Sequence, residues 1–337
     1  MGPRDEIHEI AGVQLLDREL ARAVEEGLSL VEEVLRREVQ SNYEFVTETS
    51  LHLIDAGGKR FRPLFTLIAG LVGPKAGAPE VVTAAVVVEL IHLATLYHDD
   101  VMDAATMRRG AKSANARWDN SVAILTGDFL FAHASRLVAA LGPEAVWIVA
   151  ETFAKLVTGQ MRETRGPRQG EDGIAHYLAV VSEKTGSLIA TAGRYGAMFS
   201  GCSPEQVSAL RRFGEVIGSA FQISDDIIDI ASEQASSGKT PGTDLREGVS
   251  TLPMLYAMEA GGATGARLRE LLVAPLSDDA LVDEALGLLR GSDGIARARD
   301  ALGERARSAK AALAALPDCP ARDALASLTE FVVSRVG

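Results

Sequence analysis

Several features are scarce in this sequence of 337 residues, and each scarcity argues against a class of protein. Only two cysteines occur, Cys202 and Cys319, far apart and without metal-ligand spacing, so neither a disulfide framework nor a cysteine metal site is expected. Basic residues are outnumbered, because 34 Lys and Arg stand against 46 Asp and Glu and give a net charge of −12. That balance argues against a nucleic-acid partner. Because cysteines are few, a reducing cytoplasm is the expected location.

Long hydrophobic runs are also scarce. Residues 1–6 contain no apolar stretch of the kind that a signal peptide requires, and we expect no signal peptide. The most apolar run, Val81 to Tyr97, is interrupted by Glu89 and His92 and falls short of a membrane-spanning helix. We therefore expect no transmembrane segment.

Strand-like alternation is not convincing anywhere, whereas helical periodicity is nearly continuous. The breaks are short turns containing glycine or proline, and none is a long low-complexity linker. Two segments, 79–97 and 113–140, are apolar nearly all round and are expected to be centrally buried. We predict one all-α domain over residues 1–337. Its expected helices cover 14–39, 43–55, 61–72, 79–104, 113–140, 144–163, 174–183, 186–199, 204–231, 251–259, 265–272, 279–290, 294–315 and 320–335.

Two short acidic clusters stand out, Asp99-Asp100-Val101-Met102-Asp103 and Asp225-Asp226-Ile227-Ile228-Asp229. Each places carboxylates at i, i+1 and i+4 of an apolar helical stretch, so that i and i+4 share one face. Such charge is costly in apolar surroundings unless a cation neutralises it. Oxygen ligands suit Mg²⁺, which takes one or two carboxylates and shares substrate phosphate oxygens. One cluster alone is more often a solvated helix face, but the pair predicts magnesium-diphosphate chemistry.

Basic residues accompany the clusters. Lys59 and Arg62, in the stretch from Gly57 to Pro63, can lie near a helix N-terminus, which is a natural anion site. His92 precedes Asp99 by seven residues and thus lies two turns away on the same face. A basic turn or a helical histidine is also compatible with a purely structural role. Further basic residues near the clusters are Arg108, Arg109, Lys184 and Lys239.

Together these stretches resemble the all-trans polyprenyl diphosphate synthases, the head-to-tail prenyltransferases that elongate isoprenoid chains. The resemblance covers about residues 50 to 255, and it implies an all-α bundle around a deep apolar cavity, usually a homodimer, with Mg²⁺ as cofactor. The implied substrates are isopentenyl diphosphate and an allylic diphosphate primer (dimethylallyl, geranyl, farnesyl or geranylgeranyl diphosphate). The matching stretches, in the family's order, are Gly57 to Pro63, His92 to Asp103, Arg108 to Gly110, Gly127-Asp128, Lys184-Thr185, Phe221 to Asp229 and Gly238 to Pro253.

The resemblance also implies residue roles. The residues that would ligate magnesium ions bridged to the allylic diphosphate are Asp99, Asp103 and Asp225. The other carboxylates of the clusters, as ligands or as their support, would be Asp100, Asp226 and Asp229. The same diphosphate would be held by Arg108, Lys184 and Lys239. The residues that would bind isopentenyl diphosphate without metal are Lys59, Arg62, His92 and Arg109, and the reacting centre would be lined by Thr185 and Gln222.

The chemistry of these residue types fits that reaction. An allylic diphosphate ionises only if the charge of its leaving group is stabilised, as Mg²⁺ with Lys and Arg can do. The allylic carbocation then needs a dry, apolar wall, which buried helices supply. The isopentenyl double bond attacks, and the departing diphosphate is a plausible acceptor for the proton that is lost. The reaction requires no serine or cysteine nucleophile.

Side-chain size before the first cluster bears on product length. Thr95 and Ala94, four and five residues before Asp99, lie about one turn deeper along the helix. In the resembled family a bulky aromatic residue there closes the cavity and gives short products. Both residues are small in this chain, so the pocket should continue toward Ile91. We therefore predict a long product, hexaprenyl to decaprenyl diphosphate rather than farnesyl diphosphate.

Two positions depart from the family pattern. Val249 stands where a lysine is common, which leaves Lys239 or Arg246 to supply that charge, and Gln160 stands where glutamate is frequent. Three alternatives remain open: a shorter-chain (farnesyl or geranylgeranyl) synthase, a terpene cyclase of the same fold, and a non-catalytic subunit of a heteromeric synthase. The repeated acidic cluster and the paired basic sites favour condensation over cyclisation. The intact clusters argue against a non-catalytic subunit.

Overall fold

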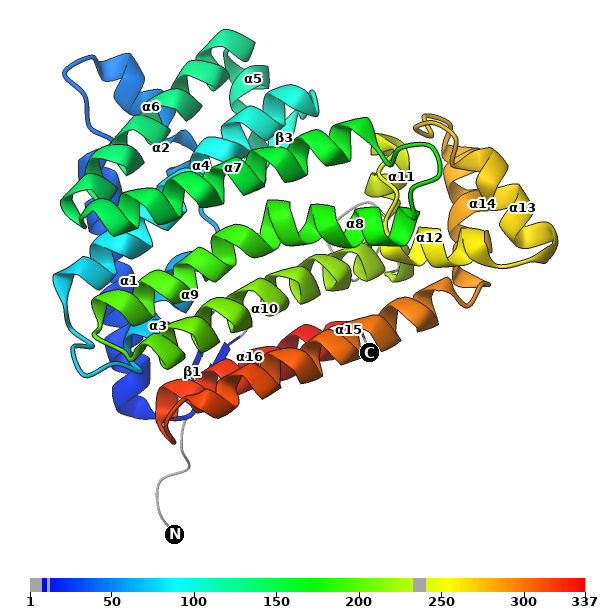
Figure 1. Cartoon of the computed structure of the whole chain (residues 1–337). Coiled ribbons are helices and arrows are strands. Elements are labelled where there is room, and N and C mark those ends of the chain that lie inside the picture. The colour runs from blue at the N-terminus through cyan, green and yellow to red at the C-terminus, as the bar shows by residue number, and fades with distance from the viewer. Residues whose placement is uncertain (1–7, 11–12, 233–240, 337) are drawn as a thin grey trace. The chain divides into compact units, whose positions relative to one another are not determined.

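The computed structural model describes residues 8–10, 13–232 and 241–336 (Figure 1). In this part of the chain the only strands form two short antiparallel hairpins, β1 (His8–Ile10) with β2 (Val13–Leu15) and β3 (Met107–Arg108) with β4 (Ala111–Lys112). The all-α prediction is confirmed. The α-helices are α1 (Arg18–Glu38), α2 (Glu44–Asp55), α3 (Phe61–Gly70), α4 (Pro79–Met102), α5 (Ala114–Arg117), α6 (Asn120–Ala140), α7 (Pro143–Arg165), α8 (Gly173–Val181), α9 (Ser187–Phe199), α10 (Pro204–Ala231), α11 (Thr243–Glu247), α12 (Leu252–Glu259), α13 (Gly262–Leu271), α14 (Asp279–Arg290), α15 (Gly294–Ala312) and α16 (Pro320–Ser334), with a π-helix η1 (Ser182–Gly186) and a 3-10 helix η2 (Leu313–Ala315).

The chain folds as two compact units. The first unit comprises Met1–Thr152, Leu188–Arg211 and Leu313–Leu325. The second unit comprises Phe153–Ser187, Arg212–Ala312 and Ala326–Gly337. The boundaries fall inside the helices α7, α9, α10 and α16 and between α15 and η2. The single-domain expectation over 1–337 stays a prediction.

The central helix of the first unit is α4, which packs against α1, α3 and α6. Every residue of α4 from Ala84 to Ile91 is buried, because this segment is apolar on all sides apart from Glu89. Helices α3 and α9 approach closely where Gly196 faces α3. A Cβ atom at Gly196 would lie 2.2 Å from the carbonyl oxygen of Thr66, so only glycine permits this approach.

Two predicted helices differ in their bounds. The first begins at Arg18 rather than at residue 14, because Asp17 caps it by accepting from the amide of Leu20 at 2.8 Å. The alternating residues before this cap form β2 instead. The predicted helix 113–140 is broken at Trp118, because Asp119 caps α6 by accepting from the amide of Val122 at 2.9 Å.

The expectation that 113–140 is centrally buried is wrong for α6. Ile124 and Leu125 of α6 are 43% and 66% exposed. Segment 79–97 is mostly buried as expected, although Pro79 and Glu80 at its start are exposed and some later residues are half-buried. By length and composition alone, α4 and α6 are both apolar enough to cross a membrane, a test that core helices also pass. The most apolar window of α4 is 67% buried within the protein, and that of α6 is 33% buried.

In the second unit α12 packs against α8, α13 and α15. Lys310 of α15 pairs with Glu330, in the part of α16 that belongs to this unit, at 3.2 Å. The short helix α11 was not predicted; it is capped by Gly242 and Gly248, which have φ of 79° and 75°. Left-handed glycines at both ends limit it to little more than one turn.

Candidate active site

The first acidic cluster occupies the last turn of α4 and belongs to the first unit. Asp103 is exposed and Asp99 is half-buried, whereas Asp100 is completely buried. The Oδ1 atom of Asp100 accepts a hydrogen bond from Arg108 Nε at 2.6 Å, and its Oδ2 atom is buried without a hydrogen-bond partner. Burial raises the pKa of Asp100, and the bond from Arg108 opposes that shift. Asp100 therefore points inward and holds Arg108, while Asp99 and Asp103 lie nearer to solvent.

The hairpin β3–β4 follows the cluster and carries Arg108 and Arg109. Arg109 adopts a left-handed φ of 54° at the turn of the hairpin. Asn115 donates from Nδ2 to the carbonyl oxygens of Asp100 at 3.0 Å and Ala105 at 3.1 Å. The side chain of Asp100 thus holds the hairpin through Arg108, and its carbonyl oxygen holds α5 through Asn115.

The second acidic cluster lies on α10 in the second unit and shows the same division. The side chain of Asp225 is 48% exposed, whereas Asp226 is 4% exposed. The two oxygens of Asp226 accept from Tyr177 Oη, in a short hydrogen bond, and from Gln222 Nε2 at 2.9 Å. Burial raises the pKa of Asp226 to about 7 against the opposing effect of these hydrogen bonds. Asp226 is therefore an inward-facing residue like Asp100.

Asp229 connects α10 to the start of α11. Its two carboxylate oxygens accept from the amides of Thr243 at 3.1 Å and Asp244 at 3.2 Å. Its carbonyl oxygen also accepts from the amide of Gly242 at 3.1 Å. These bonds hold the start of α11 against the end of α10. The predicted ligand Lys239 lies outside the described residues.

Lys184 and Thr185 lie in the π-helix η1, a distortion that often marks functional positions. Thr185 donates from Oγ1 to Gln222 Oε1 at 3.2 Å, so the structure brings these two predicted residues together. Lys184 forms a short ion pair with Glu163, which was not predicted. Gly159 lets α7 approach η1, since a Cβ atom there would lie 2.7 Å from the Lys184 amide nitrogen.

Arg335, near the end of the chain, is a site residue that sequence reasoning missed. Its Nη2 donates to Oδ1 of Asp225 at 2.5 Å. Its guanidinium also packs over the rings of Phe221 and Phe331, 5.5 and 5.8 Å from their centroids. The two partners are 110 residues apart in the sequence, and no local pattern marks this pairing.

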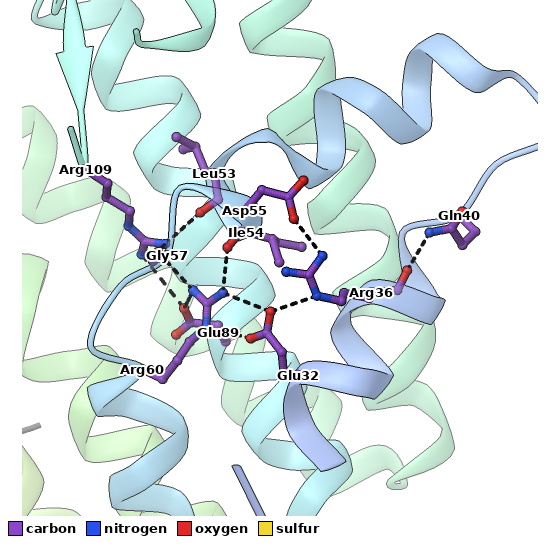
Figure 2. Close-up of polar contacts among 10 residues, drawn as sticks. All are labelled: Glu32, Arg36, Gln40, Leu53, Ile54, Asp55, Gly57, Arg60, Glu89 and Arg109. Atoms are coloured by element: carbon purple, nitrogen blue, oxygen red, sulfur yellow. Dashed lines mark hydrogen bonds and ion pairs between the residues drawn. The ribbon is translucent and has the colours of Figure 1, made fainter. Parts of the chain in front are cut away.

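A third group, in the first unit, gathers arginines around one buried carboxylate, Glu89 (Figure 2). Arg60 Nη1 lies 3.2 Å and Arg109 Nη2 lies 3.9 Å from Glu89 Oε1. Burial lowers the pKa of Arg62 to about 10, and its Nε atom is buried without a hydrogen-bond partner. Burial, and then Arg62 and Arg109, lower the pKa of His92 well below its usual value. Arg62, His92 and Arg109, which were predicted to share one substrate, therefore lie together, with a neutral histidine among the cations at pH 7.

The remaining predicted positions lie before α3, on α4 and at α11. Lys59 is exposed on the loop before α3. Ile91 and Ala94 are each 1% exposed, and half-buried Thr95 donates from Oγ1 to the carbonyl oxygen of His92 at 2.8 Å. Val249, which stands where the family often has a lysine, is half-buried. Arg246, which was considered as a source of the missing charge, instead pairs with Asp279 at 2.8 Å.

Comparison with known proteins agrees with these features. Residues 43–289 match the family model described as Polyprenyl synthetase. Nonaprenyl diphosphate synthase of Mycobacterium tuberculosis (strain ATCC 25618 / H37Rv) is 60% identical, with 97% of this chain and 98% of that protein covered. Geranylgeranyl pyrophosphate synthase from Corynebacterium glutamicum, solved with calcium and isoprenyl diphosphate, has a TM-score of 0.87 at 52% identity, covering 95% and 98% of the two chains. A decaprenyl diphosphate synthase from Rhodobacter capsulatus has a TM-score of 0.85 at 35% identity, covering 95% and 99%.

The fold and the two acidic clusters are those of a prenyltransferase, and the chain belongs to the polyprenyl synthetase family. The predicted isoprenoid synthase fold and the predicted class of enzyme, a transferase that acts as a trans-polyprenyl diphosphate synthase, are confirmed. The family match also favours a synthase over a terpene cyclase.

Proposed function

We propose that this enzyme adds isopentenyl diphosphate repeatedly to an allylic diphosphate primer, with Mg²⁺, to give a hexaprenyl to decaprenyl diphosphate and free diphosphate. The observation that carries the proposal is that the aspartates within each acidic cluster differ in their exposure to solvent. The first and fifth aspartates lie nearer to solvent, and the second is held inward by hydrogen bonds. The 60% identity to a nonaprenyl diphosphate synthase supports the long product.

In this proposal Asp99, Asp103 and Asp225 hold Mg²⁺. Their donor atoms are all carboxylate oxygens, which suit a hard cation. Within residues 8–10, 13–232 and 241–336, no three His, Cys, Asp or Glu side chains are grouped closely enough to hold a metal ion by themselves. That fits Mg²⁺, which usually takes one or two carboxylates and completes its shell with water and phosphate oxygens. Bound Mg²⁺ supplies charge stabilisation for the departing diphosphate.

The basic residues divide between two diphosphates. Arg108, Lys184 and Lys239 bind the allylic diphosphate and compensate the negative charge that develops as it leaves. Lys59, Arg62, His92 and Arg109 bind isopentenyl diphosphate without metal. A neutral His92 supports this role, because one ring nitrogen can donate to a phosphate oxygen while the other accepts. The buried apolar residues of α4 keep water from the cation, and the departing diphosphate takes the proton that is lost.

Thr95 is the chain-length residue that the helix geometry favours. It lies one turn below Asp99 on the same face and is half-buried, whereas Ala94 is rotated by roughly 140° from Asp99 and is 1% exposed. We expect Thr95→Phe to shorten the product, measured by chromatography of the dephosphorylated chains. Thr95→Val, which keeps the volume, is the matched control and should leave product length unchanged. An unchanged length in Thr95→Phe would contradict this model.

The proposed function is tested by incubating the purified chain with labelled isopentenyl diphosphate, Mg²⁺ and farnesyl diphosphate. A long polyprenyl product from the chain alone is expected. No product from the chain alone, but product after a partner protein is added, would favour the alternative of a subunit in a heteromeric synthase. A product of only four isoprene units would favour the shorter-chain alternative.

We also propose a homodimer located in the cytoplasm. The exposed apolar residues Ile124 and Leu125 on α6 and Val146 and Trp147 on α7 (40% and 61% exposed) support a covered surface, since apolar residues in a dimer interface are shielded from water. Leu125→Glu should therefore yield a monomer in light scattering. A wild-type protein that is already monomeric at micromolar concentration would refute the homodimer.

A further inference from the structure

Figure 2 shows a chain of side chains with alternating charge in the first unit. Arg36 pairs with Asp55 at 2.6 Å and with Glu32 at 3.1 Å. Arg60 then links Glu32 to Glu89, and Arg109 closes the series. The side chain of Asp55 is 56% exposed and that of Glu89 is 2% exposed, so the chain runs from the surface into the core. In order, its members are Asp55, Arg36, Glu32, Arg60, Glu89 and Arg109.

Arg60 uses every donor that it has. A guanidinium group carries five N–H bonds. Nε donates to Glu32 Oε2 at 3.0 Å, Nη1 to Glu89 Oε1 at 3.2 Å and Gly57 O at 3.4 Å, and Nη2 to Glu32 Oε1 at 3.4 Å and Ile54 O at 3.1 Å. Five donors thus meet five acceptors. No N–H of Arg60 remains for a diphosphate.

The same residue fixes an unusual backbone. Gly57, Gly58 and Arg60 have φ of 85°, 138° and 48°. A left-handed residue other than glycine is uncommon and persists where its surroundings hold it in place. Position 58 favours glycine as well, because other residues rarely adopt its φ, and a Cβ atom there would lie 2.8 Å from Arg109 Cζ. The contacts of Arg60 therefore determine the course of the loop that carries Lys59.

We infer that Arg60 is a positioning residue for isopentenyl diphosphate: it does not touch the substrate, but it fixes the loop so that Lys59 and Arg62 meet the diphosphate. Glu32 and Glu89 hold Arg60 in that place. Glu89 has a second effect, because its carboxylate offsets part of the positive charge of the buried arginines. The inference rests on the proposed function, in which Lys59 and Arg62 bind that diphosphate.

The test separates stability from substrate binding. Arg60→Met leaves Glu89 buried without its nearest cation, so the thermal midpoint should fall. The KM for isopentenyl diphosphate should rise roughly tenfold, with the KM for farnesyl diphosphate unchanged within about twofold, because only one diphosphate site loses its geometry. In the double variant Arg60→Met, Glu89→Gln, the carboxylate that lost its nearest cation is replaced by a neutral amide. Its midpoint should recover while the KM for isopentenyl diphosphate stays high. A KM that recovers together with the midpoint would overturn the inference.

Two further variants complete the test. Arg60→Lys keeps the charge but has three donors for five acceptors, so its KM for isopentenyl diphosphate should stay raised. A wild-type KM in Arg60→Lys would overturn the inference. Arg62→Met tests the underlying function, and an unchanged KM there would reject Arg62 as a ligand. A raised KM in Arg62→Met together with a wild-type KM in Arg60→Met would reject only the inference about Arg60.

Discussion

Replacing Arg335 by glutamine should tighten the binding of Mg²⁺ to the substrate-free enzyme. Arg335 Nη2 donates to Oδ1 of Asp225 at 2.5 Å. A metal ion that uses this oxygen must displace the guanidinium, and the two cations also repel each other. Glutamine keeps a polar side chain of moderate length but removes the charge, so Asp225 becomes available without that displacement.

The magnitude follows from the exposure of the pair. The side chains of Arg335 and Asp225 are 19% and 48% exposed, so the ion pair is largely screened by water. Pairs of this kind contribute about 0.2–1 kcal/mol. Since about 1.4 kcal/mol corresponds to a tenfold change in an equilibrium constant, the dissociation constant of Mg²⁺ should fall by roughly 1.4- to 5-fold.

Isothermal titration with Mg²⁺ alone, at low ionic strength and without diphosphate, measures this change directly. Arg322→Gln is the matched control, because Arg322 lies on α16, the helix that Arg335 directly follows, and pairs with Asp318 at 2.6 Å. That variant should bind Mg²⁺ like the wild type. An Arg335→Gln variant that binds Mg²⁺ equally well or more weakly would show that Arg335 does not compete for Asp225.

Two other predictions concern stability. Gly196→Ala should lower the free energy of unfolding in urea by about 1–3 kcal/mol, because the new Cβ atom meets the backbone of α3. In the control Gly287→Ala on α14, the new Cβ atom meets no atom within 4 Å, and the free energy of unfolding should rise by about 0.5–1 kcal/mol. Equal effects of the two variants would contradict the packing argument. Burial raises the pKa of Asp226 from 3.8 to about 7, so the folded state binds the proton of this carboxyl group more tightly than the unfolded chain does. The stabilisation that this proton gives is greatest below pH 3.8 and is lost as the pH rises toward 7. In EDTA, Asp226→Asn should therefore lose less unfolding free energy between these pH values than the wild type, and identical slopes would count against the shift.

The sequence predicted the long helices well, and its errors have local causes. Periodic apolar positions over many residues define a helix face, so α4 and α10 agree with prediction to within a few residues. The break at Trp118 was missed, because helical residues continue on both sides and the cap at Asp119 is a single hydrogen bond. The burial of α6 was overestimated for another reason. Composition shows that a helix is apolar, but it does not show which neighbour covers each face.

The predicted site residues show a similar limit. Asp99, Asp100 and Asp103 could be found because their spacing is local, and so could the group around Asp225. Glu89 was noticed only as an interruption of an apolar run. Its meaning depends on Arg60 and Arg109, 29 and 20 residues away, which the fold brings to it. Partners so distant in the sequence leave no periodic signal. Only the folded structure shows that every N–H group of the Arg60 guanidinium already has a hydrogen-bond acceptor.

The division within the two acidic clusters follows from helix geometry. Residues i and i+4 point the same way, whereas residue i+1 is rotated by roughly 100°. On a helix with one face against solvent or substrate, i+1 therefore turns toward the protein interior, where a carboxylate needs a partner. Asp100 has Arg108, and Asp226 has Tyr177 and Gln222. In each unit the second aspartate thus orients its surroundings, and the first and fifth lie nearer to solvent.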